Sequence, residues 1–236
     1  IISENGGRRV VITTPQKGKK QALIEMAARN AASQFAKEQD ARSLKEKMLL
    51  DLAEALKLTR FPERIECLDT SNISGHDPVA SVVSFKWGEK DKSRSKLFKI
   101  KTTEKADDYT AMKEVIRRHF TRAKEKNDFC DLFIVDGGKG QLNCALEALE
   151  ELKIVCVDVI SVGKEEARHD KGLTQEKIFV PHQKEPFLFE IRSPLLFLLQ
   201  KIRDEAHRTA IGFHRKRRSK RILSSSLDSL SGIGPI

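Results

Sequence analysis

A short apolar run followed at once by an acid and a glycine pair constrains this chain more than any other feature. Leu132-Phe133-Ile134-Val135 runs into Asp136-Gly137-Gly138-Lys139-Gly140-Gln141, and helix-forming residues continue to Leu152. This pattern predicts a buried strand, a tight turn and a helix. Open α/β sheets bind ligands at the carboxyl ends of their strands. We therefore expect Asp136 to lie at a functional site.

A second strand-like run ends in the same way. Residues 64–68 precede Asp69, and the turn-forming residues 70–72 follow it. If the two strands are parallel neighbours, both carboxylates lie at one edge of the sheet and can hold a hard divalent cation. The alternative is that each acid only caps a helix or a turn, as Asp commonly does. The pairing of Asp69 with Asp136 favours the metal site.

A nucleotide site is the other interpretation of the glycine-rich turn. The turn lacks the spacing and the Lys-Ser/Thr pair of a phosphate-binding P-loop, so the sequence does not favour a nucleotide there.

The chain opens with a predicted N-terminal arm, residues 1–60. It combines a β-branched strand at 8–14 with a helix from Lys17 to Leu58, and Pro62 closes the region. The main domain is predicted over 61–224.

The main domain shows the element order βββαβαβ. Three strands in series favour antiparallel pairing and the later strand-helix-strand units favour parallel pairing, so we predict an α/β fold with a mixed sheet flanked by helices. The predicted elements are strands at 64–69, 79–87 and 95–102, a helix at 107–126, a strand at 132–135, a helix at 140–152 and a strand at 155–162.

The last third of the chain predicts a long helix with a basic end. Residues 163–176 are charged and irregular, and residues 178–189 resemble a β-hairpin. Ser193-Pro194 then has the form of a helix start. Residues 215–221 place six basic side chains in seven positions. Such a run can be a solvated helix face, but its density favours contact with phosphates.

The overall charge favours the same kind of partner. Forty-four Lys and Arg residues exceed 34 Asp and Glu residues, for a formal net charge of +10. A basic chain attracts a polyanion such as nucleic acid, although charge alone is equally compatible with a generally basic surface.

Other features predict the compartment. The four cysteines form no C-x-x-C pair and read as reduced core residues. No apolar stretch is long enough to cross a bilayer, and the start lacks the pattern of a signal peptide. We expect a cytoplasmic protein without a membrane partner. The first residue is not Met and the last residues stop within a motif, so we expect a fragment of a longer protein.

Two further residues are candidates with structural alternatives. Asp108 opens a predicted helix, where a negative side chain commonly meets the helix dipole. His207 lies inside a predicted helix beside charged residues, where a histidine is either structural or functional. The histidines show no H-x-x-x-H spacing with an acid, so a zinc protease site is not supported.

These motifs together resemble those of the UvrC family, the incision subunit of the bacterial UvrABC excision repair nuclease. The matching stretches are Pro15–Gly18 through Arg29–Ala31, Arg64–Ser71, Asp107–Tyr109, Ile134–Gln141, Arg203–Arg208 and Phe213–Arg215. One departure is Asn72, which stands where the family usually has a histidine.

The resemblance implies a ribonuclease H-like fold and an endonuclease that cuts the damaged DNA strand on the 5′ side of the lesion. It places the catalytic residues at Asp69, Asp136, His207 and Asp108, with Mg²⁺ or Mn²⁺ held by the first three. It also implies a UvrB–DNA complex and damaged double-stranded DNA as partners. Residues 225–236 would be a linker and the start of a helix-hairpin-helix module. The expected DNA contacts are Lys139, Gln141, Arg203, Arg215, Arg217, Arg218 and Lys220.

Several alternatives stay open on the sequence. His207 is either a metal ligand or a general base, and one or two metal ions can bind. A catalytically silent DNA-binding or partner-docking module is the alternative function. A ribonuclease that acts on RNA:DNA hybrids is disfavoured, because a histidine stands where those enzymes generally have a carboxylate.

Overall fold

The computed structural model describes residues 15–71, 78–100, 108–164, 176–181 and 183–228, of which residues 71 and 217–228 are described by their backbone alone. The chain divides into two compact units, Ile1–Lys45 and Glu46–Ile236. The strand expected at 8–14 lies outside the described residues, and the domain boundaries expected from the sequence stay predictions.

The first unit contains most of helix α1 (Lys19–Leu56). The helix agrees with the one predicted over 17–58. Its side chains within this unit are largely exposed, whereas Leu49, Leu52 and Leu56 near its end are fully buried in the second unit. Removing the side chain of one such leucine, as in Leu52→Ala, would cost about 2–5 kcal/mol of stability.

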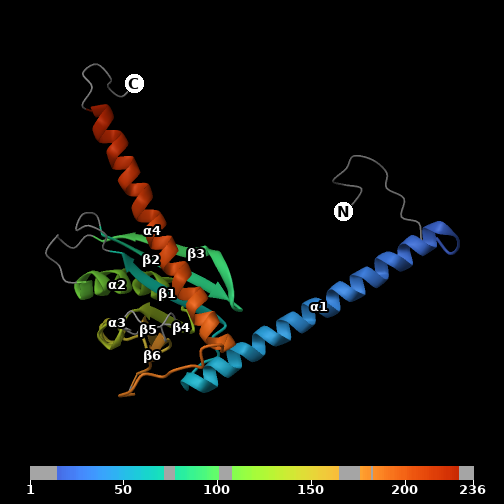
Figure 1. Cartoon of the computed structure of the whole chain (residues 1–236), viewed down its shortest axis with the longest axis horizontal. Helices are drawn as coiled ribbons and strands as arrows, with labels where there is room; N and C mark the ends of the chain where they lie inside the picture. Colours follow the sequence, from blue (N-terminus) through green and yellow to red (C-terminus); the bar gives the residue numbers. More distant parts are fainter. Residues whose placement is uncertain (1–14, 72–77, 101–107, 165–175, 182, 229–236) are drawn as a thin grey trace. The chain divides into compact units, whose positions relative to one another are not determined.

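The second unit is built on a six-stranded mixed sheet in the order β3-β2-β1-β4-β5-β6 (Figure 1). Strand β1 pairs antiparallel with β2 and parallel with β4, and β5 runs parallel to β4. This arrangement confirms the predicted βββαβαβ order and mixed sheet. The strands are β1 (Arg64–Ser71), β2 (Val79–Lys86), β3 (Glu89–Lys99), β4 (Leu132–Asp136), β5 (Asp158–Lys164) and β6 (Glu176–Phe179).

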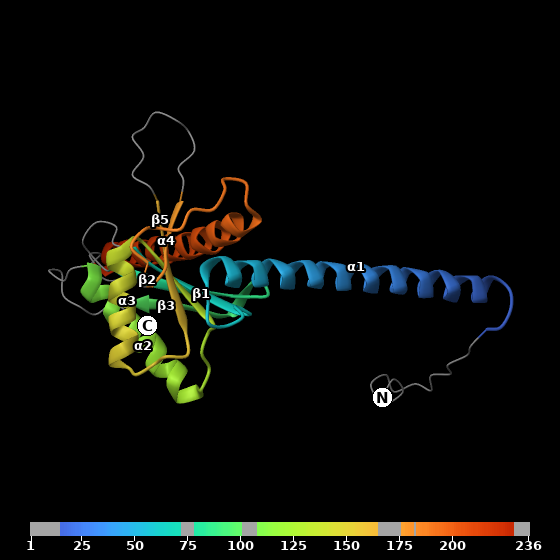
Figure 2. The same cartoon turned by 90° about the horizontal axis from the view of Figure 1, so that it is seen from below.

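Helices cover both faces of this sheet (Figure 2). Helices α2 (Asp108–Lys126) and α3 (Lys139–Glu151) pack on one face, and α4 (Pro194–Asp228) packs on the other with the end of α1. Strand β1 serves both cores because its side chains alternate: Ile65 and Cys67 face α4, and Leu68 faces α2 and α3. Among the described residues, none of the helices combines the length and the apolar character that crossing a membrane requires.

Two local predictions differ from the structure. Strand β3 begins at Glu89, not at residue 95, because the charged residues after Gly88 lie on an exposed edge strand, where polar side chains are tolerated. Trp87 and Gly88, with φ of 54° and 72°, form the two-residue turn that joins β2 to β3. Of the hairpin expected at 178–189, the described residues form one bridge, between Ile178 and Phe187, and β6 pairs with β5.

Candidate metal centre

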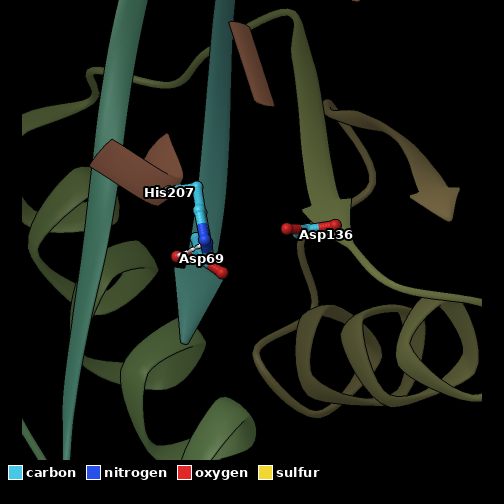
Figure 3. A group of neighbouring side chains, drawn as sticks. All are labelled: Asp69, Asp136 and His207. Carbon is cyan, nitrogen blue, oxygen red and sulfur yellow. Dashed lines mark hydrogen bonds and ion pairs between the residues drawn. The ribbon is translucent and has the colours of Figure 1, made fainter. Parts of the chain in front are cut away.

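The two strand-end acids lie side by side. Strands β1 and β4 are parallel neighbours, and Leu68 is paired with Val135, so Asp69 and Asp136 are the next residues along each strand. This confirms the parallel pairing that the sequence argument required. Figure 3 shows both carboxylates at the ends of their strands, with His207 beside Asp69.

His207 reaches the acids from helix α4. Its Nδ1 atom lies 3.3 Å from Oδ2 of Asp69, although the two residues are 138 positions apart in the chain. One ligand atom from each of Asp69, Asp136 and His207 lies within 4.8 Å of the others. The side chain of Asp69 is 7% exposed and that of His207 is 58% exposed, so the cluster is closed toward the core and open toward solvent.

Helix α4 places His207 through an apolar stripe. Leu199, Ile202, Ala206 and Ala210 are fully buried on this helix, at the spacing of one helical face. His207 follows Ala206 directly and so lies at the rim of the stripe, where its ring can leave the core without breaking the packing.

The electrostatics of Asp69 suit a cation. Burial raises the pKa of this carboxyl above its ordinary value, and His207, Arg203 and the backbone N–H of Thr70 lower it in part. The charged form is therefore disfavoured by the protein alone, and a bound cation would restore it. Two carboxylates and an imidazole nitrogen at these distances fit a divalent metal ion.

The turn after Asp136 depends on glycine. Gly137 has a φ of +142°, and a Cβ atom there would lie 2.6 Å from Cγ of Gln141. A Cβ atom on Gly163 of the adjacent strand would lie 2.9 Å from the Gly137 carbonyl oxygen. Hydrogen bonds also hold Gly138: its N–H donates to Oε1 of Gln141 at 2.9 Å, and the Ser161 hydroxyl donates to its carbonyl at 3.0 Å. The turn therefore holds Asp136 rigidly.

Arg203 lies one helical turn before His207 and is buried. Its guanidinium donates to Glu176 on β6, and also to Oδ1 of Asp204 at 2.8 Å. Burial lowers the pKa of this guanidinium, but the hydrogen bond to Asp204 and the charge of Glu176 outweigh it, so the pKa is raised and Arg203 stays charged. A cavity of about 360 Å³ opens here, lined by Asp136, Gly137, Gly138, Gly163, Phe179, Arg203, Asp204 and His207.

The remaining candidates lie around this cluster or outside the described side chains. Asp108 is exposed as the first residue of α2 and is not among the three converging ligands. Lys139 and Arg215 are exposed, whereas the amide oxygen of Gln141 caps α3. The basic run continues α4 as predicted, and Arg217, Arg218 and Lys220 are described there by their backbone alone.

Sequence reasoning missed the buried polar groups that support the cluster. Glu176 holds Arg203, and the hydroxyl of Ser81 on β2 donates to the carbonyl of Ala206 at 2.8 Å. Neither residue belongs to a motif, and a lone acid or serine in a strand carries no local signal of its distant partner.

Comparison with known proteins identifies relatives along the whole chain. The family described as the UvrC RNAse H endonuclease domain matches residues 53–211, and the UvrC Ribonuclease H-like domain matches residues 1–38. UvrABC system protein C of Protochlamydia amoebophila is 54% identical over 100% of this chain and 38% of its own length. The Desulfotalea psychrophila protein of the same name is 45% identical over 94% of this chain and 36% of its own length. The chain thus spans less than half of these relatives.

Solved structures with a similar arrangement include two endonucleases V. That of Ciona intestinalis has a TM-score of 0.41 at 11% identity and covers 80% of this chain and 99% of its own. That of Streptomyces avermitilis has a TM-score of 0.42 at 10% identity and covers 77% of this chain and 94% of its own.

Proposed function

The chain belongs to the family of UvrC RNase H endonuclease domains, and from this we propose that it cuts the damaged DNA strand on the 5′ side of a lesion in nucleotide excision repair. The observation that carries the proposal is the convergence of Asp69, Asp136 and His207 at the edge of the sheet. A module that only docks on a partner has no need for two strand-end carboxylates and an imidazole that converge where the site is open to solvent.

Asp69 and Asp136 would hold Mg²⁺ or Mn²⁺, because both ions prefer hard oxygen ligands. Such an ion, when bound, polarises a phosphate oxygen and activates water for attack. The rigid strands and the glycine turn keep both carboxylates in place against their mutual repulsion.

His207 has two roles that suit its position, ligand and general base. If Nδ1–H donates to Asp69, the opposite ring nitrogen can accept the proton that water loses as its oxygen bonds to phosphorus. The bond from phosphorus to the leaving sugar oxygen then breaks. Arg203 lines the same cavity with a permanent positive charge, which suits a phosphate.

DNA would approach the open side of the cluster. Exposed Lys139 and Arg215 provide positive charge on α3 and α4, and the basic run continues along α4. Contacts of this kind position a duplex by its phosphates without reading its sequence. We propose damaged double-stranded DNA on a UvrB complex as the partner, in the bacterial cytoplasm.

The test is incision of a lesion-containing duplex by the full-length protein while the metal is varied. We expect cutting with Mg²⁺ or Mn²⁺, none in a chelator, and none with Ca²⁺, whose larger and looser coordination shell positions phosphate and water poorly. The control is the same protein carrying Asp69→Ala, which should stay inactive with every metal. Incision that persists in a chelator, or returns only with Zn²⁺, would contradict the proposal. Intact DNA binding with no incision under any metal would favour the silent docking module.

A further inference from the structure

Helix α4 must be held at one position along its own axis, relative to the sheet, if His207 is to lie beside Asp69. The apolar stripe of α4 packs through contacts that have no preferred direction and tolerate small shifts along the helix. A directional contact near His207 would remove this freedom.

Ser81 makes such a contact. It lies on β2 directly opposite Asp69 in the antiparallel pair of β1 and β2. Its side chain is fully buried, and its hydroxyl donates to the carbonyl of Ala206 at 2.8 Å, across 125 positions of the chain. Ala206 is joined to His207 by a single peptide bond. A short path therefore runs from Asp69 through Ser81 and Ala206 to His207.

The chemistry of this hydrogen bond indicates that it positions α4 more than it stabilises the fold. A carbonyl oxygen has two lone pairs, and that of Ala206 can also accept the N–H of residue 210 within the helix. Losing the Ser81 hydroxyl therefore leaves no buried group without a partner. What is lost is the direction that the hydrogen bond imposes on this turn of α4.

A second contact holds the preceding turn of the helix from the other side. Glu176 on β6 pairs with Arg203, and both side chains are less than a tenth exposed. In the sheet order, β2 lies on one side of β1 and β4 while β6 lies on the other. The segment of α4 from Arg203 to His207 is thus tied at both flanks of the two strands that bear the acids. Arg203 also lines the cavity, so a change there would affect the site directly. A change at Ser81 tests the position of α4 alone.

We propose that Ser81 is a positioning residue for the metal centre, because its hydrogen bond to Ala206 sets the turn of α4 that brings His207 to Asp69. This inference rests on the proposed function, in which Asp69 and His207 act together. It assigns no contact with DNA or with the reacting atoms to Ser81.

The test is Ser81→Ala in the full-length protein. Loss of a group that orients a metal ligand commonly lowers metal affinity or activity by about 10–100-fold. We expect kcat for incision to fall by about 10-fold, KM for DNA to stay within about twofold, and Mn²⁺ binding measured by calorimetry to weaken by about 10-fold. Ser81→Thr, which restores the hydroxyl, should recover most of both.

Ser84→Ala is a matched control. Ser84 is also fully buried on β2, but its hydroxyl makes no hydrogen bond with the described residues. It lies opposite Glu66, on the face of the sheet away from α4. We expect this variant to keep the wild-type kcat and Mn²⁺ affinity.

If Ser81→Ala matches Ser84→Ala in both kcat and Mn²⁺ affinity, the proposal is wrong and Ser81 only contributes to packing. If Ser81→Ala does not fold, Ser81→Cys retains a small side chain but donates only weakly. The same losses are expected for it, and wild-type behaviour would overturn the proposal. Incision by Asp69→Ala would instead overturn the proposed function, whatever Ser81 does.

Discussion

Strand β1 offers an acid to a histidine on each face of the sheet. Asp69 lies 3.3 Å from Nδ1 of His207 on the α4 side, and Glu66 lies 2.7 Å from Nε2 of His119 on the α2 side. The chemical groups are alike, but their surroundings differ. Glu66 and His119 are 4% and 2% exposed, whereas His207 is 58% exposed.

The buried pair, Glu66 and His119, is surrounded by aromatic rings. His119 stacks on Phe133 at 6.0 Å and meets the edges of Phe98 and Phe120 at 6.2 and 5.0 Å. Among the described residues, the Glu66–His119 pair has no second acid beside it, whereas the exposed pair of Asp69 and His207 has Asp136. An acid beside a histidine is therefore a candidate metal centre only when a further ligand and access from solvent come with it. We assign the Glu66–His119 pair to holding α2 on the sheet.

Substitution of the acids on the α4 side should have the largest effect on incision. We expect Asp69→Ala or Asp136→Ala to lower incision of a lesion-containing duplex by about 100-fold or more, because several kcal/mol of transition-state stabilisation are lost. DNA affinity and folding should stay near wild type. A rate above about a tenth of wild type in either variant would contradict the metal assignment.

The histidines test the comparison directly. His207→Ala should lose most of the incision rate, about 10–100-fold, with little change in stability because the ring is exposed. His119→Ala should instead lower the free energy of unfolding by about 3 kcal/mol or more, since it leaves Glu66 buried without its partner. Urea unfolding and incision by the folded fraction measure the two effects. The comparison fails if both variants change the same quantity.

The basic end of α4 should affect DNA binding without affecting the chemistry. Neutralising Arg217, Arg218 and Lys220 together should weaken duplex binding for all sequences and reduce the salt slope by roughly 0.9 for each phosphate that the protein no longer neutralises. Neutralising Arg122, Lys124 and Lys126 on α2 is the matched control, because these residues belong to the helix on the other face. An equal change in both variants would mean that net charge alone is responsible.

The smallest expected effect concerns stability without metal. The pKa of Asp69 is raised by burial, so its contribution to stability is present below its ordinary pKa and is lost as the pH rises through the raised one. Near neutral pH, Asp69→Asn should therefore raise the melting temperature of the metal-free protein and remove the gain that Mg²⁺ or Mn²⁺ gives the wild type. A lower melting temperature for Asp69→Asn without metal would show that the ionised carboxyl is stabilising there.

The sequence alone determined the elements that depend on neighbouring residues. The apolar runs before Asp69 and Asp136, the glycine turn and the serine-proline start of α4 are local patterns, because strand period, left-handed turns and helix starts involve only nearby positions. The βββαβαβ order followed from them. The edge strand β3 was predicted too short, because its first residues are charged and do not show the apolar pattern of a strand.

Only the tertiary structure decided which of these residues lie together. The parallel pairing of β1 with β4 joined the two acids, and the packing of α4 brought His207 to Asp69 across 138 positions. The anchors Ser81 and Glu176 have no sequence signal, because a hydrogen bond depends on the distance between two atoms in space. The same holds for the contrast between His119 and His207: each histidine lies in a charged helix, and only the packing on opposite faces of the sheet leaves His119 buried and His207 exposed.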